Sequence, residues 1–332
     1  MAEKITVGIN GFGRIGRRLF RLLYGHPKVA VVAINDIATA KTLSHLLKYD
    51  SIHGILGQRV SAVENAITVG NENYRFTSTK KIEKIDWGKL DVVVECSGKY
   101  KTRGELAHHV RNGAKRVILS VPPAKDDIKT IVLGVNDHTL STGDTIVSNA
   151  SCTTNNAAPM LKTLAGLCGI KEAYITTVHS YTTDQSLHDQ PHPDLRRARA
   201  AGQSIVPTTT GAAKALTKIF PHLANNIGGC GIRVPVANGS LTDVTVHAEK
   251  DTTIAAVNGA FRSAAATTLK NILEYTDEPL VSVDIVGNPH SCIFDAGMTS
   301  VIGKMVKIIG WYDNETGYAS RLVDLVLKMH AK

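Results

Sequence analysis

Three glycines near the N-terminus constrain the fold of this chain more than any other feature. Gly11-Phe12-Gly13-Arg14-Ile15-Gly16 has the spacing G-x-G-x-x-G, follows a β-branched run over Ile5–Asn10 and opens an amphipathic stretch over Arg14–Tyr24. A strand, a glycine turn and a helix in this order are typical of dinucleotide-binding folds. Gly11 would allow the tight turn, Gly13 would let backbone approach a pyrophosphate, and Gly16 would let the helix pack closely on the strand. The helix N-terminus would offer its N–H groups to the anion.

The second predicted strand, Val29–Asp36, ends on a carboxylate. Asp36 stands 20 residues after Gly16, where a carboxylate can accept hydrogen bonds from the adenosine ribose hydroxyls of a bound dinucleotide. The same carboxylate would repel a 2′-phosphate. The sequence therefore predicts NAD as the cofactor in preference to NADP.

Short β-branched runs alternate with helix-like stretches through the first 150 residues, apart from a less regular stretch over 50–79. This alternation predicts βαβ units and a parallel, doubly wound sheet. Beyond residue 150 the pattern changes to a helix over 153–168 and to more alternating strands, which indicate a mixed or antiparallel sheet with helices on one face. We therefore expect a nucleotide-binding domain over 1–150, completed by the C-terminal helical segment 315–332, and a second domain over 151–314.

The composition argues against several classes of protein. No apolar run of this 332-residue chain reaches the roughly 18 residues that a membrane span needs. Met1–Ile5 leads directly into the first predicted strand without a basic or apolar leader, so we expect a cytoplasmic protein. The cysteines form no Cys-x-x-Cys pair, which favours reduced thiols over a disulfide framework, and we expect no metal site. They stand at positions 96, 152, 168, 230 and 292.

The formal net charge of +9 fits two kinds of partner. A basic surface can bind nucleic acid, or it can suit an enzyme that acts on anionic substrates. The basic residues are spread along the chain, with no run longer than pairs such as Arg17-Arg18, and aromatic residues make up only 5%. Because base-stacking platforms are scarce, we favour anionic substrates and keep RNA or polyanion binding as the alternative from a different class.

Cys152 has the setting of a nucleophile. It stands at a predicted strand-to-helix junction within Val147–Asn155, where a helix N-terminus would stabilise the thiolate and lower the pKa of the thiol. By contrast, Cys96 lies within a predicted apolar strand, Cys168 late in an apolar helix, and Cys230 in a glycine-rich turn. A structural cysteine at a helix start remains the alternative for Cys152.

A reactive cysteine needs a base, and His179 at the end of a strand-like run over 173–178 is a rigidly mounted choice. Anion-binding groups come next along the chain. The arginines of 196–199 and Arg233 supply guanidinium groups for phosphate. The segment Thr208–Ala213 reads as a further helix start with unpaired N–H groups.

Taken together, these segments resemble the phosphorylating, NAD-dependent glyceraldehyde-3-phosphate dehydrogenases over essentially the whole chain. The most specific motif is Ser151-Cys152-Thr153-Thr154-Asn155. The other matching segments, in family order, are 10–17, 46–51, 177–182, 195–201, 207–214, 233–235 and 311–315.

The resemblance implies a Rossmann domain, a catalytic domain with a mixed eight-stranded sheet, and a homotetramer. It implies that Cys152 attacks the aldehyde of glyceraldehyde 3-phosphate with His179 as base, and that a thioester is resolved by inorganic phosphate to 1,3-bisphosphoglycerate, a reaction of glycolysis and gluconeogenesis. It assigns the substrate phosphate to Thr182, Arg197 and Arg233, with Asp184 orienting an arginine. It assigns the attacking phosphate to Ser151, Thr153, Thr210 and Gly211. The NAD contacts would be Gly11, Gly13, Arg14, Ile15, Gly16, Asp36, Ser120 and Asn314, with Tyr318 near the nicotinamide.

Four positions depart from the family pattern. Asn156 stands where many members have a second cysteine, Lys80 where an arginine usually lies near the adenine, and Ala319 where a serine is common. Gln190 precedes Pro191 where NAD-specific members usually have leucine, which leaves use of NADP open. The related erythrose-4-phosphate dehydrogenases, in which water resolves the thioester, are the alternative enzyme. Thr182 and Thr208–Gly211 favour the phosphate-using branch.

Overall fold

The computed structural model describes residues 3–331, and residues 1, 2 and 332 lie outside the described residues. The start of the predicted leaderless N-terminus and the last residue of the predicted C-terminal segment therefore cannot be compared with it. The described chain divides into two units. The first contains 3–131, 138–150 and 319–331, and the second contains 132–137 and 151–318.

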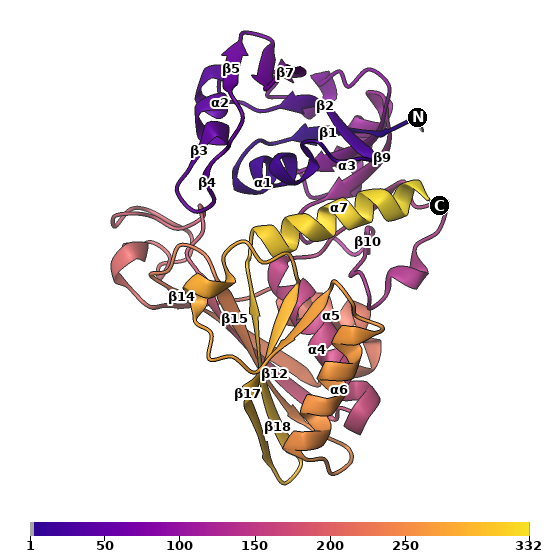
Figure 1. The fold of residues 1–332 in the computed structure, drawn as a ribbon, viewed down its shortest axis with the longest axis vertical. Helices are drawn as coiled ribbons and strands as arrows, with labels where there is room; N and C mark the ends of the chain where they lie inside the picture. The colour runs from indigo at the N-terminus through magenta and orange to yellow at the C-terminus, as the bar shows by residue number, and fades with distance from the viewer. Residues whose placement is uncertain (1–2, 332) are drawn as a thin grey trace. The chain divides into compact units, whose positions relative to one another are not determined.

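A nine-stranded sheet forms the centre of the first unit (Figure 1). Its strands from β10 to β7 run parallel, and β6 and β5 add an antiparallel extension at one edge. The predicted parallel, doubly wound sheet is confirmed, and much of the irregular stretch over 50–79 becomes this extension. In sheet order the strands are β10 (Lys129–Thr130), β11 (Ile146–Ser148), β9 (Ala114–Leu119), β8 (Leu90–Glu95), β1 (Ile5–Asn10), β2 (Val29–Asn35), β7 (Glu72–Thr77), β6 (Ala66–Val69) and β5 (Val60–Val63).

The central strands of this sheet are buried because their β-branched residues fill both faces. Val93 and Ala33 pack with Trp87 and Ile85 in one apolar cluster, and Val117 and its neighbours pack with a helix in another. The helices and a short hairpin of the unit are α1 (Arg14–Leu23), α2 (Ala40–Lys48), β3 (Tyr49–Asp50) with β4 (Gly54–Ile55), α3 (Arg103–Arg111) and, from Ala319 onward, α7 (Thr316–His330).

The second unit is built on a mixed sheet of seven strands, one fewer than the family resemblance implies. In sheet order these strands are β13 (Val206–Thr208), β14 (Ile227–Val234), β12 (Glu172–Ser180), β15 (Ser240–His247), β18 (Met305–Tyr312), β17 (Cys292–Ile302) and β16 (Leu273–Thr276). The helices α4 (Cys152–Cys168), α5 (Ala212–Ile219) and α6 (Ile254–Ala266) pack against it (Figure 1).

One face of this second sheet is covered and the other is open. Along β12, Ala173 and Ile175 are buried, whereas Glu172 and Tyr174 on the opposite face are exposed. This alternation has the period of two that a half-covered strand requires. The predicted sheet with helices on one face is therefore confirmed.

Candidate active site

Cys152 is the first residue of α4, as the sequence predicts. The hydroxyl of Ser151 caps this helix by accepting a hydrogen bond from the Thr154 N–H at 3.1 Å. Ala150, which precedes the cap, is fully buried and has a φ of 56°, a left-handed conformation that is uncommon for a residue with a side chain. The backbone is thus held in a tight turn directly before the thiol.

His179 lies beside this thiol. Its Nε2 is 3.4 Å from Cys152 Sγ, although the two residues come from different elements, α4 and β12. Strand β12 also pairs with the parallel strand β14, in which Arg233 lies in register with His179. Neighbours in register project from the same face of a sheet, and Arg233 Nη1 accordingly lies 2.8 Å from His179 Nδ1. The predicted nucleophile, base and one predicted phosphate ligand therefore form a contiguous row.

The ring of His179 is held by a backbone carbonyl. Nδ1 is 2.7 Å from the Ser180 oxygen, its shortest contact, and Arg233 Nη1 donates to the same oxygen at 3.0 Å. A guanidinium can only donate, so the Arg233 contact favours an unprotonated Nδ1, whereas the Ser180 carbonyl favours a protonated one. When Nδ1 donates to the Ser180 oxygen and Arg233 donates to that oxygen in place of Nδ1, the lone pair of Nε2 faces the sulfur of Cys152. In this tautomer His179 can accept the thiol proton.

Burial sets the protonation state of the pair. Burial, together with the positive charge of Arg233, lowers the pKa of His179 to about 3. Burial also raises the pKa of the Cys152 thiol, while Arg233 and Thr153 oppose this shift. The expectation that the helix N-terminus gives a lowered thiol pKa is therefore wrong, because loss of solvation outweighs the nearby donors. Both shifts favour the neutral partners, from which the proton leaves sulfur as the thiol reacts.

Tyr312, at the end of β18, links the two sides of the site and was missed by the sequence interpretation. Its buried hydroxyl lies 2.9 Å from Thr153 Oγ1 on α4 and 2.9 Å from Thr177 Oγ1 on β12. Its ring meets His179 edge to face at 5.9 Å between centroids. In the sequence, Tyr312 was marked only by its place two residues before Asn314 in the matching segment 311–315. Its contacts were not predicted, because the sequence does not reveal the pairing of β15 with β18.

The second group of predicted phosphate ligands is joined around Asp184. The hydroxyl of Thr182 donates to one carboxylate oxygen of Asp184, and Arg197 Nη1 donates to the other at 2.5 Å. Although burial opposes ionisation, the Thr182 hydroxyl and the charges of Arg233 and Arg197 hold the pKa of Asp184 below its usual range. Asp184 and Arg197 also act electrostatically on His179, so this group and the catalytic pair form one charged environment.

Thr210 and Gly211 mark the start of α5, as predicted. Thr210 Oγ1 accepts a hydrogen bond from the Ala212 N–H at 3.2 Å, and Gly211 is the exposed N-cap residue. Arg197 reaches toward the same segment, because its Nε donates to Thr208 Oγ1 at 3.0 Å. The structure thus connects the Thr208–Gly211 segment to Arg197, but it shows no direct contact of Thr210 or Gly211 with Cys152.

The three motif glycines in the first unit have different steric surroundings. A Cβ at Gly11, where φ is +91°, would lie 2.4 Å from the Ser97 nitrogen, and a Cβ at Gly16 would lie 2.2 Å from the Gly11 oxygen. At Gly13 a Cβ would meet no protein atom within 4 Å. Two glycines are therefore required by the fold itself, whereas Gly13 leaves open space at the start of α1. This is the arrangement that a pyrophosphate needs.

Asp36 follows β2 directly and holds the glycine turn. Its Oδ2 accepts from the Phe12 N–H at 2.6 Å and its Oδ1 from the Ala38 N–H at 2.9 Å. The guanidinium of Arg14 forms a bidentate pair with Asp50. Burial opposes ionisation of Asp50, but its hydrogen bonds, including those from Arg14, lower its pKa to about 2. The side chain of Arg14 is thus engaged within the protein, and Ile15 lies half-buried in the first turn of α1.

The remaining predicted cofactor residues have varied surroundings. Ser120 is buried directly after β9, and Lys80 is exposed, with its carbonyl accepting from the Tyr100 hydroxyl at 2.9 Å. The Oδ1 of Asn314 accepts from Ser180 Oγ at 2.8 Å and from Ser240 Oγ at 3.0 Å. Since both hydroxyls fix the amide oxygen, the amide nitrogen of Asn314 is the group oriented for a ligand. Tyr318 is buried in α7.

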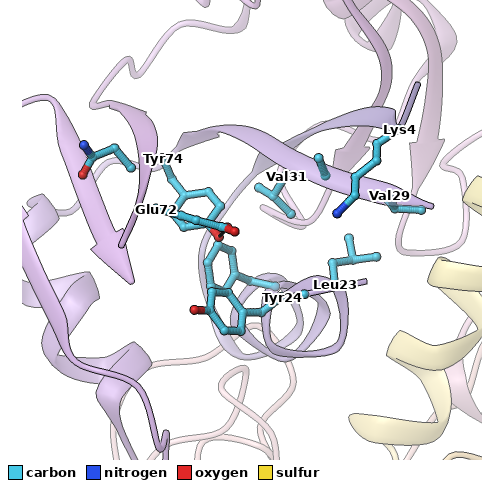
Figure 2. Close-up of a pocket in the computed structure, with 11 residues that line it drawn as sticks. Lys4, Leu23, Tyr24, Val29, Val31, Glu72 and Tyr74 are labelled. Carbon is cyan, nitrogen blue, oxygen red and sulfur yellow. Dashed lines mark hydrogen bonds between the residues drawn. The ribbon is translucent and has the colours of Figure 1, made fainter. Parts of the chain in front are cut away.

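A pocket in the first unit does not coincide with these residues. It is lined by Lys4, Tyr24, Val29, Glu72 and Tyr74, among others, at the amino ends of β1, β2 and β7 (Figure 2). Ligands of open α/β sheets bind at the carboxyl ends of the strands. None of the predicted site residues lines this pocket.

The other cysteines lack a comparable base contact. Burial raises the pKa of the Cys96 thiol to about 12, and it also raises the thiol pKa of Cys168 and Cys292. Cys230 was predicted in a turn, but it lies within strand β14. The glycines around it, Gly228, Gly229 and Gly231, belong to this strand and lie close to neighbouring groups. Proximity to a histidine, rather than a distinctive thiol pKa, sets Cys152 apart.

Comparison with known proteins agrees with this site. Residues 5–103 match the family model described as the NAD binding domain of glyceraldehyde 3-phosphate dehydrogenase, and residues 151–314 match the C-terminal domain of the same family. The chain is 48% identical over 332 residues to the Geobacillus stearothermophilus glyceraldehyde-3-phosphate dehydrogenase, with 99% of each chain covered. The chain belongs to the glyceraldehyde-3-phosphate dehydrogenase family.

Other members of this family are similarly close. Glyceraldehyde-3-phosphate dehydrogenase 1 of Bacillus cereus is 47% identical over 330 residues, with 98% of each chain covered. The Mycobacterium avium glyceraldehyde-3-phosphate dehydrogenase is 48% identical over 331 residues, with 97% of each covered. Within residues 3–331, no helix is long and apolar enough to span a membrane, and no cluster of three or more histidine, cysteine or acidic residues forms a metal-binding group.

Proposed function

We propose that this chain oxidises D-glyceraldehyde 3-phosphate with NAD and inorganic phosphate, giving 1,3-bisphosphoglycerate. The observation that carries the proposal is the 3.4 Å contact between Cys152 Sγ and His179 Nε2, with Arg233 in register beside the histidine. Family membership supplies the aldehyde, since the relatives are named for it.

The first step is addition of the thiol to the aldehyde. Cys152 Sγ forms a bond to the carbonyl carbon, and its proton passes to His179 Nε2. The resulting hemithioacetal oxygen needs a donor as charge develops on it, and the protonated His179 can supply one. Loss of hydride to the acceptor that the bound cofactor would supply, and transfer of the hydroxyl proton to His179 Nε2, then leave a thioester on Cys152. Phosphate attacks the carbonyl carbon of this thioester, the C–S bond breaks, and the sulfur of Cys152 takes up a proton as the acyl phosphate leaves.

The residues of the first unit fit a dinucleotide. NAD, when bound, supplies the hydride acceptor. Open space at Gly13, the N-terminus of α1 and the carboxylate of Asp36 offer groups for the pyrophosphate and the adenosine ribose. We assign the further contacts to Gly11, Arg14, Ile15, Gly16, Lys80, Ser120, Asn314 and Tyr318.

Two anion sites are needed because both the substrate and the attacking group carry phosphate. We assign the substrate phosphate to Thr182, Arg197 and Arg233. The guanidinium of Arg233 lies close to His179, and that of Arg197 lies close to Asp184. Asp184 holds Arg197 in place. The attacking phosphate would use Ser151, Thr153, Thr210 and Gly211, which combine two helix starts with hydroxyl donors.

We also propose a homotetramer in the cytoplasm. The uncovered face and tip of the second sheet expose apolar side chains, with Tyr174 52% exposed and Ile302 67% exposed. Exposed apolar surface of this kind is typical of interfaces between subunits. A nucleophilic thiol at Cys152 needs a reducing compartment to remain reactive, which supports the cytoplasm.

The test is an NAD reduction assay on purified protein with and without phosphate. We expect turnover of glyceraldehyde 3-phosphate only when phosphate or arsenate is present, and a faster rate with NAD than with NADP. Cys152→Ser should abolish turnover because a hydroxyl is a far weaker nucleophile at neutral pH. Turnover that does not depend on phosphate, or a preference for erythrose 4-phosphate, would contradict the proposal.

A further inference from the structure

A polar network with a buried centre lies beneath the glycine turn, and the chemistry above does not use it. Its centre is Glu95, the last residue of β8, which is 0% exposed. Asn10 ends β1 and Asn35 ends β2, and the register pairs Asn10 with both Glu95 and Asn35. Three polar side chains thus end three adjacent strands in one row at the carboxyl edge of the sheet.

Four donors converge on the carboxylate of Glu95. Oε2 accepts from Asn10 Nδ2 at 2.5 Å and lies 3.0 Å from His109 Nε2, which is also 0% exposed. Oε1 accepts from the Ser97 N–H at 2.7 Å and from the Ser97 hydroxyl. An ionised carboxylate only accepts hydrogen bonds, whereas a protonated carboxyl group also donates one. The four donors around Glu95 therefore match the ionised form.

The protons of the network can be assigned from its two ends. The indole Nε1 of Trp87, which can only donate, lies 2.9 Å from His109 Nδ1. Nδ1 must therefore be the unprotonated nitrogen, so His109 is neutral and Nε2 donates to Glu95. At the other end the Thr79 N–H donates to Asn35 Oδ1 at 2.9 Å, which directs the Asn35 amide nitrogen to Asn10 Oδ1 at 2.8 Å. The side-chain hydrogen bonds from Trp87 through His109, and from Asn35 through Asn10, therefore both run toward Glu95.

This network includes residues on both sides of Gly11. Asn10 precedes Gly11 in the chain, and the Ser97 amide is the group that a Cβ at Gly11 would strike. The Cys96 N–H also donates to the Asn10 carbonyl at 2.7 Å. Any shift of Glu95 would move both Asn10 and Ser97, and with them the φ and position of Gly11.

We propose that His109 is a positioning residue for cofactor binding: its neutral imidazole, protonated on Nε2, holds the Glu95 carboxylate, which fixes Asn10 and Ser97 around Gly11. The inference rests on the proposed use of NAD. His109 lies on α3 behind the sheet and acts through Glu95, so it does not touch the cofactor. Without its N–H, one oxygen of a buried carboxylate loses a donor, and such a loss is costly.

The test compares two amide variants of different reach. His109→Gln can present its amide nitrogen where Nε2 stands, whereas the shorter His109→Asn can meet Trp87 but cannot reach Glu95. His108→Asn, on the same helix and without a contact to Glu95, is the matched control. NAD affinity is measured by titration calorimetry, and the rate of Cys152 alkylation by iodoacetamide without NAD reports on the second unit.

We expect His109→Asn to bind NAD about tenfold more weakly than the wild type, with a raised KM for NAD and little change in kcat at saturating NAD. His109→Gln should recover most of the affinity, and both variants should keep wild-type alkylation of Cys152. Equal NAD affinity in the Asn and Gln variants would overturn the inference.

Amide hydrogen exchange in the unliganded protein separates this inference from the proposed function. The segments around Gly11 and Ser97 should exchange faster in His109→Asn than in the wild type and in His109→Gln. Wild-type protein that binds no NAD would contradict the proposed function, and the exchange comparison would still decide the role of His109. Unchanged exchange in these segments would contradict that role alone.

Discussion

Cys152 and His179 come from a helix start and a strand end, and their side chains meet where His179 is buried and Cys152 is partly exposed. Loss of solvation favours the neutral form of both groups, because it raises the pKa of the thiol and lowers that of the imidazole. Reactivity depends on a short path for the proton from sulfur to Nε2, 3.4 Å long.

The neutral state of His179 predicts a dependence of stability on pH. The pKa of this imidazole is about 3 in the folded chain, against an ordinary value of 6.5. Between these values the unfolded chain binds a proton that the folded chain does not, so the free energy of unfolding falls as pH falls from about 6.5 to about 3. His179→Gln removes this site, and its stability should fall less steeply over the same interval.

Urea unfolding at several pH values between about 7 and 5 measures this difference. The control is His222→Gln, because His222 is exposed. It should follow the wild-type pH dependence. A His179→Gln variant with the wild-type slope would show that the imidazole is not held neutral by burial.

Tyr312→Phe tests the link between α4 and β12. The change removes a hydroxyl that meets Thr153 and Thr177 and leaves the ring packed against His179. Each threonine loses a buried partner, so we expect a destabilisation of about 1–3 kcal/mol and a lower kcat with a nearly unchanged KM for the aldehyde. Steady-state kinetics and urea unfolding measure both effects. A variant with wild-type kcat would remove Tyr312 from the catalytic arrangement.

At the scale of elements, local patterns were predictable and long-range pairings were not. The strand–turn–helix around Gly11 and the helix start at Cys152 depend on neighbours in sequence, and both were predicted. The register of His179 with Arg233 and the contacts of Tyr312 depend on strand pairing, which the sequence does not reveal. Cys230 was misassigned because a glycine-rich strand that packs closely on its neighbours has the composition of a turn.

The glycine turn allows one substitution to be compared at two positions. Gly16→Ala would bring a Cβ within 2.2 Å of the Gly11 oxygen, and we expect overpacking to cost about 1–3 kcal/mol. Gly13→Ala meets no protein atom and should leave stability nearly unchanged. It should nevertheless weaken NAD binding, since its methyl group would occupy the space proposed for the pyrophosphate.

Thermal unfolding and calorimetric NAD titration distinguish the two effects. The account predicts a lowered Tm for Gly16→Ala, and a wild-type Tm with reduced NAD affinity for Gly13→Ala. Wild-type NAD affinity in Gly13→Ala would contradict the assignment of the pyrophosphate to this turn.

At the scale of the whole molecule, the exposed sheet face of the second unit predicts self-association. Tyr174→Asp puts a charge on that face, and its burial against another subunit would be costly. We expect sedimentation velocity to show a tetramer for the wild type and smaller species for the variant. Val63→Asp, at another exposed apolar position, on β5, is the control and should remain tetrameric. A monomeric wild type would contradict the proposed assembly.

We propose that Cys152 carries a thioester that phosphate resolves. Mass spectrometry of the intact protein, mixed with NAD and glyceraldehyde 3-phosphate in phosphate-free buffer, tests it most directly. We expect an acyl adduct that maps to Cys152, accumulates with one equivalent of NADH, and disappears when phosphate is added, with formation of 1,3-bisphosphoglycerate. NADH formation without an adduct on Cys152, or an adduct that phosphate does not release, would contradict it.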